Sequence, residues 1–220
     1  MNKRYKLVIF DWDGTLMDST ARIVSCLQQS AILSGLKKPS AEQARQVIGL
    51  GLQEGFNILF PNEDISTTQQ VAEHYKQEFV LRNTTSHGLF PGVLDWLESG
   101  HPDHLLMAVA TGKSRAGLDR ELTNNSMHHH FVTTRCADEC FSKPHPQMIA
   151  EILNETGMDP QQAVMVGDTT FDLDMANSAG VDSLGIAQGA HSREQLLNSH
   201  PITIVDSFSD AATWLNKRVI

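Results

Sequence analysis

Short, unbroken runs of apolar residues recur along this chain and are separated mostly by segments with helical periodicity. A strand that is apolar at every position is buried on both faces, and its alternation with helices is typical of a parallel sheet covered on both sides. We therefore predict an α/β fold whose core is a Rossmann-like, doubly wound parallel sheet. Its strands are expected at residues 7–10, 105–110, 131–134, 163–166, 184–187 and 202–205.

One interval breaks this rhythm. Between residues 16 and 86 the sequence shows only helical patterns, which is too long for a simple crossover between two strands. Ser40 and Gln43 have the spacing of a capping box at the start of one helix. An apolar stripe at helical spacing marks another helix: Val71, Tyr75 and Phe79.

These patterns predict two domains. An all-helical cap domain, residues 16–87, is inserted into a core domain made of residues 1–15 and 88–220. Because the insertion leaves and rejoins the core beside residues 11–13, it is placed to act as a lid over them.

The composition indicates a globular protein and bears on its partners. The 220 residues include 17 basic and 26 acidic side chains, for a net charge of −9, which argues against nucleic acid or an anionic membrane as a partner. No segment approaches the ~20 apolar residues that cross a bilayer, and the run at 7–10 is too short for a secretory signal. Cys26, Cys136 and Cys140 lack a zinc-like spacing and are interpreted as reduced thiols. We expect a cytoplasmic monomer or homodimer.

Two carboxylates follow the first predicted strand directly. Asp11 and Asp13 lie in the sequence Phe-Asp-Trp-Asp-Gly-Thr, where a glycine-containing turn can bring both to one pocket. Two close anions repel unless a cation lies between them or one is protonated. A nucleophile, a proton carrier and a divalent metal ion fit this pair, although an isolated pair is equally compatible with an ordinary acidic turn.

Two further segments have the chemistry of a phosphate site. Thr111 and Gly112 stand where a predicted strand runs into a helix, so that a hydroxyl and free N–H groups can cradle a phosphate. Lys143, which precedes Pro144, can neutralise the phosphate and the nearby acids. Taken alone, the first segment is compatible with a common Thr-Gly turn and the second with a solvated lysine.

A fourth segment supplies two more acids. Asp168 ends a predicted strand, and Asp172 lies four residues later, on the same side of the helix that follows. Hard oxygen ligands of this kind suit Mg²⁺. Because open α/β sheets bind their ligands at the carboxyl ends of the strands, we expect all four segments to meet there.

In this order the four segments resemble the four motifs of the haloacid dehalogenase-like hydrolase superfamily. The inserted helices resemble the cap of its phosphoglycolate phosphatase-like and β-phosphoglucomutase-like branches. The motifs are Asp11-Trp12-Asp13-Gly14-Thr15, Thr111-Gly112, Lys143-Pro144 and Gly167-Asp168 with Asp172.

The resemblance implies a role for each of these residues. Asp11 attacks phosphorus and forms an aspartyl-phosphate, and Asp13 carries the proton. The phosphoryl oxygens are held by Thr111, Gly112 and Lys143. The ligands expected for Mg²⁺ are Asp11, Asp13, Asp168 and Asp172.

The function that follows is a Mg²⁺-dependent phosphatase acting on a small phosphorylated metabolite. The segment Ile48–Gly55 resembles the substrate-facing cap loop of phosphoglycolate phosphatases, so 2-phosphoglycolate is the leading candidate. A phosphomutase of the β-phosphoglucomutase type would use the same core. A non-catalytic phosphate-binding regulator is a second alternative, although the acid at position 13 favours the two enzymes.

Three other features have an expected place. We interpret the run His128–His130 as a solvated turn rather than a metal site, and Met17, Met165 and Met175 as packing residues. Trp12 either lines the mouth of the pocket or packs beneath the cap.

Overall fold

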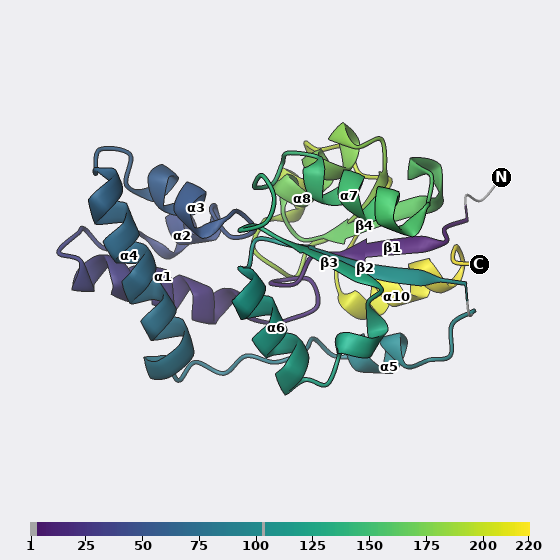
Figure 1. Cartoon of the computed structure of the whole chain (residues 1–220), viewed down its shortest axis with the longest axis horizontal. Coiled ribbons are helices and arrows are strands. Elements are labelled where there is room, and N and C mark those ends of the chain that lie inside the picture. Colours follow the sequence, from purple (N-terminus) through teal and green to yellow (C-terminus); the bar gives the residue numbers. More distant parts are fainter. Residues whose placement is uncertain (1–3, 103) are drawn as a thin grey trace.

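Six parallel strands form one sheet within residues 4–102 and 104–220, the part of the chain that the computed structural model describes (Figure 1). The strand order is β3-β2-β1-β4-β5-β6, with the first strand in the middle of the sheet. Each strand predicted from the sequence is present, β1 with the predicted bounds and the others with ends displaced by at most two residues. The strands are β1 (Leu7–Phe10), β2 (Leu106–Thr111), β3 (Thr133–Cys136), β4 (Ala163–Gly167), β5 (Asp182–Ile186) and β6 (Thr203–Val205).

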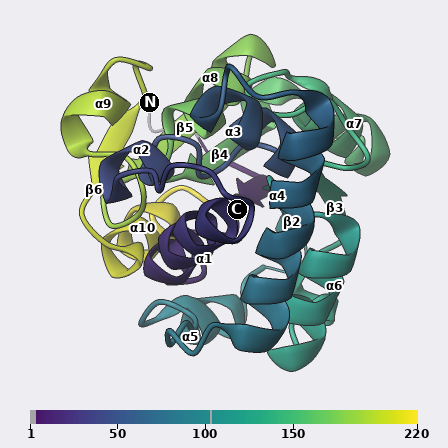
Figure 2. The ribbon, with the colours of Figure 1, turned by 90° about the vertical axis from the view of Figure 1, so that its left-hand side faces the viewer.

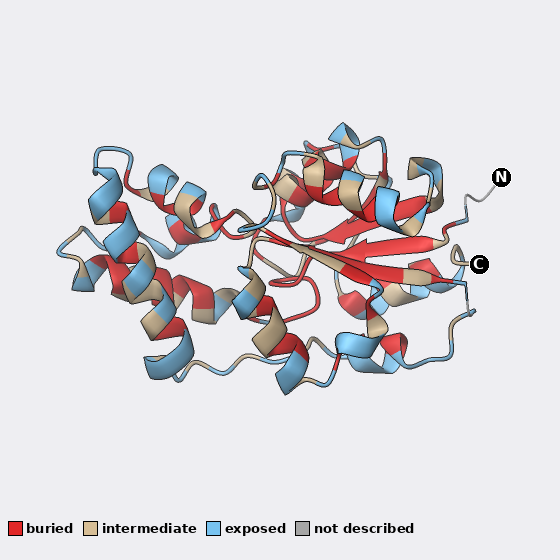
Figure 3. Cartoon of the chain, viewed as in Figure 1, coloured by how far each residue is buried: buried red, intermediate tan, exposed pale blue. Residues whose placement is uncertain are grey.

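Both faces of the sheet are covered, because β1 is buried on each side (Figure 3). Val8 and Phe10 pack in an apolar cluster with residues of α5, α6 and α10, whereas Leu7 and Ile9 pack with residues of α7 and α8. This alternation is the period of a strand, and it confirms the doubly wound sheet. The helices of the core are α5 (Val93–Leu97), α6 (Arg115–Asn124), α7 (Gln147–Thr156), α8 (Thr170–Ser178), α9 (Arg193–Leu197) and α10 (Phe208–Asn216).

The inserted helices lie at the carboxyl ends of the strands and have an apolar cluster of their own (Figures 1 and 2). They enter and leave beside each other, because Asp18 N–H donates to the Gly88 carbonyl at 2.7 Å. We call them the cap helices; the domain boundaries at 16 and 87 stay predictions. They are α1 (Thr20–Leu33), α2 (Ala41–Arg45), α3 (Leu52–Leu59), α4 (Ile65–Gln77) and the π-helix η1 (Glu78–Arg82).

Local signals account for some of these helices and not for others. The capping box at Ser40 is confirmed, because its hydroxyl accepts from Gln43 N–H at 3.0 Å and Gln43 accepts from Ser40 N–H at 2.9 Å. The segment Ile48–Gly55, compared above with a loop, is a turn only as far as Gly51. From Leu52 onward it is helix α3, because its apolar side packs against the other cap helices.

The burial of several side chains shows where they lie in the fold. Trp12 is fully buried in the cluster that covers β1, with its ring edge-on to Phe131 at 6.3 Å, and it does not line the cavity described below. The expected packing role of Met17, Met165 and Met175 is confirmed, since all three are buried. His128–His130 form a short 3-10 helix on the surface.

All three cysteines are free thiols. Among the described residues, no helix combines the length and the apolar character that a membrane crossing requires.

The central strand supports a prediction about stability. Ile9 of β1 is fully buried beneath α7 and α8. Ile9→Ala should therefore lower the free energy of unfolding by about 2–5 kcal/mol. The same change at Ile202, which is 51% exposed, should cost less than about 1 kcal/mol. Urea denaturation of both variants checks this, and equal losses would contradict the central position of β1.

Candidate active site

A tight turn at the end of β1 directs two acids to the carboxyl edge of the sheet. Asp11 N–H still donates to the Val166 carbonyl of β4 at 2.9 Å, after which the chain turns sharply. Gly14 makes this possible, because its φ is +83° and a Cβ there would collide with the Asp168 carboxylate. The glycine therefore allows the first and fourth motifs to approach each other closely.

Three carboxylates and one ammonium group form a buried cluster at this edge. Oxygens of Asp11, Asp168 and Asp172 all lie within 4.8 Å of one another. The Lys143 ammonium donates to Asp11 Oδ1 at 2.7 Å and to Asp172 Oδ1 at 2.6 Å. All four side chains are buried. Because there are three carboxyl groups and only one ammonium group, a fully ionised cluster would carry more negative charge than the lysine balances.

The charge imbalance is visible in the pKa values. Burial raises the pKa of Asp11 well above its usual range, opposed by Lys143 and reinforced by Asp172. Burial and the nearby Asp172 raise the pKa of Asp168 to about 7, although Ala190 N–H and the Thr15 hydroxyl donate to it at 2.7 and 2.8 Å. Burial alone would lower the pKa of Lys143, but its two carboxylate partners outweigh burial and raise it.

The residues of the cluster fit a divalent metal ion. Asp11 Oδ2 is buried and has no hydrogen-bond partner among the residues that the structure describes, although buried polar atoms are rarely left unpaired. Carboxylate oxygens are the ligands that hard cations prefer, and a cation would relieve the excess negative charge. The cluster can therefore hold such an ion.

The second acid of the turn has different partners. Asp13 Oδ1 accepts from the Ser19 hydroxyl at 2.6 Å and lies 3.0 Å from the Lys113 ammonium, so its carboxylate stands apart from the three clustered acids. Ser19 precedes α1 as its N-cap, but its hydroxyl serves Asp13 rather than the helix. The Lys113 ammonium also lies 4.9 Å from the centre of the Phe79 ring in the cap helices.

Sequence reasoning missed the role of Lys113. The available signal was its place directly after Thr111 and Gly112, in a turn already expected at the site. The Thr111 hydroxyl accepts from Lys113 N–H at 3.2 Å, which fixes this turn.

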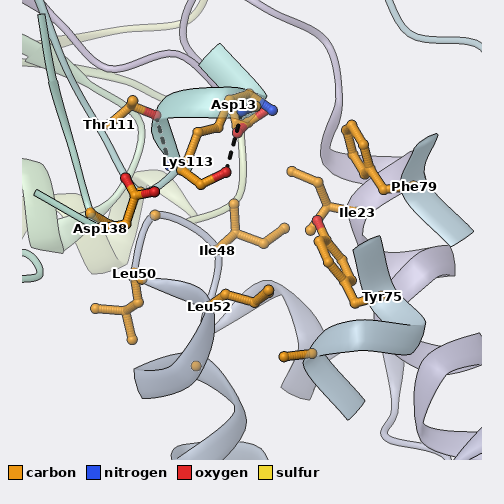
Figure 4. A pocket seen from close by; sticks show the side chains of 18 of the residues that line it. Asp13, Ile23, Ile48, Leu50, Leu52, Tyr75, Phe79, Thr111, Lys113 and Asp138 are labelled. Atoms are coloured by element: carbon orange, nitrogen blue, oxygen red, sulfur yellow. Dashed lines mark hydrogen bonds and ion pairs between the residues drawn. The ribbon is translucent and has the colours of Figure 1, made fainter. Parts of the chain in front are cut away.

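A cavity of about 680 Å³ separates the cap helices from the core (Figure 4). Its core side contains four of the predicted site residues and Lys113, whereas Lys143, Asp168 and Asp172 do not line it and are buried next to Asp11. The predicted site residues that line the cavity are Asp11, Asp13, Thr111 and Gly112.

The sequence profile of the haloacid dehalogenase-like hydrolases matches residues 8–186, which include all four motifs. The chain belongs to the haloacid dehalogenase-like hydrolase family.

Alignments of this hydrolase with its relatives cover nearly its whole length. A protein of Dickeya dadantii, named probable phosphatase IndB, is 36% identical, and the match covers 93% of this chain and 90% of the relative. A phosphoglycolate phosphatase of Agrobacterium fabrum is 26% identical, with 97% and 94% covered. The solved structure of a haloacid dehalogenase-like protein from Streptococcus pneumoniae is similar to this fold, with a TM-score of 0.81, 24% identity, and 96% and 98% of the two chains covered.

The raised pKa of Asp168 predicts a pH dependence of stability in metal-free buffer. Between pH 3.8 and about 7 the folded protein retains a proton on Asp168 that the unfolded chain releases, so stability decreases as pH rises through this window. Asp168→Asn removes that loss. At pH ~8 the free energy of unfolding of this variant should exceed that of the wild type by on the order of 1–3 kcal/mol, and the difference should vanish near pH ~4. Urea unfolding against pH measures it.

Asp174→Asn is the matched control for this experiment, because Asp174 is not one of the clustered acids. It should follow the wild-type profile. Identical pH profiles for Asp168→Asn and the wild type would contradict the raised pKa of Asp168.

Proposed function

We propose that this hydrolase is a Mg²⁺-dependent phosphatase that acts on a small phosphorylated metabolite through an aspartyl-phosphate. The observation that carries the proposal is the buried cluster of Asp11, Asp168, Asp172 and Lys143, which meets the cavity at Asp11, beside the lining residues Asp13 and Thr111. A second acid beside the nucleophile is what distinguishes hydrolysis of a phosphate ester from simple phosphate binding.

Asp11, Asp168 and Asp172 would hold the Mg²⁺ ion, together with the backbone carbonyl of Asp13. Both oxygens of Asp172 already accept hydrogen bonds, from Lys143 and from Thr169, so it would bind the ion with a remaining lone pair or through water. When bound, the ion supplies positive charge against the phosphate oxygens.

Asp11 is suited to nucleophilic attack. Lys143 donates to Oδ1, whereas Oδ2 has no hydrogen-bond partner within the described part of the chain. Attack by Asp11 on phosphorus forms an Asp11–phosphorus bond as the bond from phosphorus to the substrate alcohol breaks. The Thr111 hydroxyl, Gly112 N–H and Lys143 would hold the phosphoryl oxygens during this transfer.

Asp13 would handle the proton. Ser19 and Lys113 fix its carboxyl group at the cavity, where it gives a proton to the departing alkoxide. In the second half-reaction Asp13 takes a proton from the water that attacks the phosphoryl group. The Asp11–phosphorus bond then breaks, and free Asp11 and inorganic phosphate are regenerated.

The cap helices would exclude bulk water from this chemistry. Their segment 46–51 contacts the core at separate points: Gly51 N–H donates to the Ser142 hydroxyl at 2.8 Å, and the Gln46 and Gln195 side chains are 2.8 Å apart. A Cβ at Gly112 would lie 2.6 Å from the carbonyl oxygens of Gly49 and Leu50. These contacts support a closing lid, and opening would use the paired connections near residues 18 and 88.

The names of the relatives make 2-phosphoglycolate the first substrate to test. The three free cysteines support a cytoplasmic location.

The catalytic scheme predicts a large loss in Asp11→Asn, which lacks the nucleophile: phosphate release with Mg²⁺ should fall by at least ~10³-fold. Asp13→Asn should lose roughly 10²–10⁴-fold, because only the proton carrier is removed. Asp174→Asn is the control, because Asp174 lies on α8, the helix that also carries Asp172; this variant should retain wild-type turnover. Release of inorganic phosphate from a panel of phosphate esters is the measurement, and near-normal turnover by Asp11→Asn would overturn the scheme.

The same assay tests the metal. Chelation should abolish phosphate release, and added Mg²⁺ should restore it. Unchanged turnover in chelator would contradict the metal requirement.

Contact between the lid and the core makes Gly112→Ala a further test. The added methyl group must push away the carbonyl groups of Gly49 and Leu50, so kcat/KM should fall by about 10²-fold while the fold remains stable. Gly88→Ala is the matched control, because a Cβ there meets no atom of the described residues within 4 Å. Equal activities of the two variants would show that the close approach at Gly112 is not needed.

A further inference from the structure

The residues that line the cavity indicate the chemistry of the substrate's leaving group, the part that is not phosphate. We infer that the leaving alcohol is bulky and mostly apolar, with an aromatic or branched hydrocarbon body, rather than a compact acid or a polyol. This inference rests on the proposed phosphatase function and concerns the same site.

The two sides of the cavity differ in chemistry (Figure 4). The core side presents Asp11, Asp13, Thr111 and Lys113, which are groups for phosphate chemistry. The opposite side, from the cap helices and the segment before α3, is mostly apolar and aromatic. Its main members are Ile23, Ile48, Leu52, Tyr75 and Phe79.

The size of the cavity agrees with a large leaving group. Its volume of about 680 Å³ lies within the roughly 300–1,000 Å³ that drug-sized ligands occupy. A two-carbon acid joined to phosphate would leave much of this apolar wall facing water. A hydrocarbon body would cover it and gain the free energy of removing apolar surface from water.

The charges around the cavity disfavour a carboxylate on the leaving group. Lys113 is already paired with Asp13, and Lys76 is an exposed residue whose ammonium lies 3.9 Å from Glu73. Glu54 and Asp138 add negative charge to the lining. Arg120 also lines the cavity, from the core helix α6 rather than from the cap helices. A carboxylate placed against the cap helices would therefore be desolvated without a dedicated cation.

Polar partners for a sugar are also scarce on this wall. The amide nitrogen of Gln53 donates to Asn57 and Thr68, at 3.0 and 2.7 Å, and so is already used. Among the described residues, the Tyr75 hydroxyl makes no hydrogen bond, and it belongs to the lining. The polar groups left on this wall are the Tyr75 hydroxyl, Gln53 Oε1 and the Glu54 carboxylate, and they stand among mostly apolar side chains.

The test compares phosphate esters of primary alcohols that differ in size and polarity, using the full chain with Mg²⁺. The probes are 2-phenylethyl phosphate, 3-methylbutyl phosphate, glycerol 3-phosphate and 2-phosphoglycolate. We expect kcat/KM for the first two to exceed that for the last two by at least ~10-fold, because each buried hydrocarbon group contributes on this scale. Equal values, or a preference for 2-phosphoglycolate, would overturn the inference.

A pair of variants on α3 locates the preference in the wall. Leu52→Arg places a cation in the lining and should lower kcat/KM for 2-phenylethyl phosphate by at least ~10-fold, with a smaller loss or a gain for 2-phosphoglycolate. Ile58→Arg adds the same charge at a position that is 58% exposed and outside the lining, and should leave both values unchanged. Parallel losses for both esters in Leu52→Arg would contradict the assignment.

Binding separates failure of this inference from failure of the proposed function. Calorimetric titration of the Asp11→Asn variant with the same esters and Mg²⁺ measures recognition without turnover. Tighter binding of 2-phenylethyl phosphate, with no ester hydrolysed by the wild type, would support the pocket and overturn the phosphatase. Hydrolysis of 2-phosphoglycolate with no preference in binding would support the phosphatase and overturn the pocket.

Discussion

The ion pairs that Lys143 makes with Asp11 and Asp172 are the interactions on which the site depends. Removing three carboxylates from water costs several kcal/mol for each ionised group unless they are paired or protonated. One ammonium group and the donors on Asp168 offset part of this cost, and the raised pKa values of Asp11 and Asp168 show the part that remains. The two apolar layers on either face of the sheet supply the stability that tolerates such a cluster.

The same topology explains why residues far apart in sequence meet. The central position of β1, with β2 and β4 on either side, brings the ends of three parallel strands to one edge. Asp11, Thr111 and Asp168 each follow or end one of these strands, so their convergence needs no special loop. Lys143 differs, because it reaches the cluster from a connection that precedes α7, and its place depends on packing rather than on strand register.

This difference sets what the sequence could predict. The strands were predictable because their apolar runs are a property of the local sequence, and the convergence of Asp11, Thr111 and Asp168 because strand ends share an edge. The pairing of Lys113 with Asp13 was not, since it depends on how the turn after Thr111 is fixed and on Phe79, which lies in a separate apolar cluster. The start of α3 was missed for a similar reason: its apolar side is satisfied only by other cap helices. Trp12 was expected at the mouth of the pocket or beneath the cap, and its packing in the core cluster with Phe131 shows that neither placement was right.

The cavity joins these two kinds of structure. Its core wall is built from residues fixed by the sheet, where charge and hydrogen bonds act on a phosphate group. Its other wall comes from helices whose sequence must only stay apolar enough to pack and to close. Because Gly112 lets segment 46–51 approach to backbone contact, the two walls meet without a side chain between them. A change in the helical wall can thus alter which alcohol is accepted while the acids and Lys143 keep their arrangement, which is why the chemistry follows from the motifs and the substrate does not.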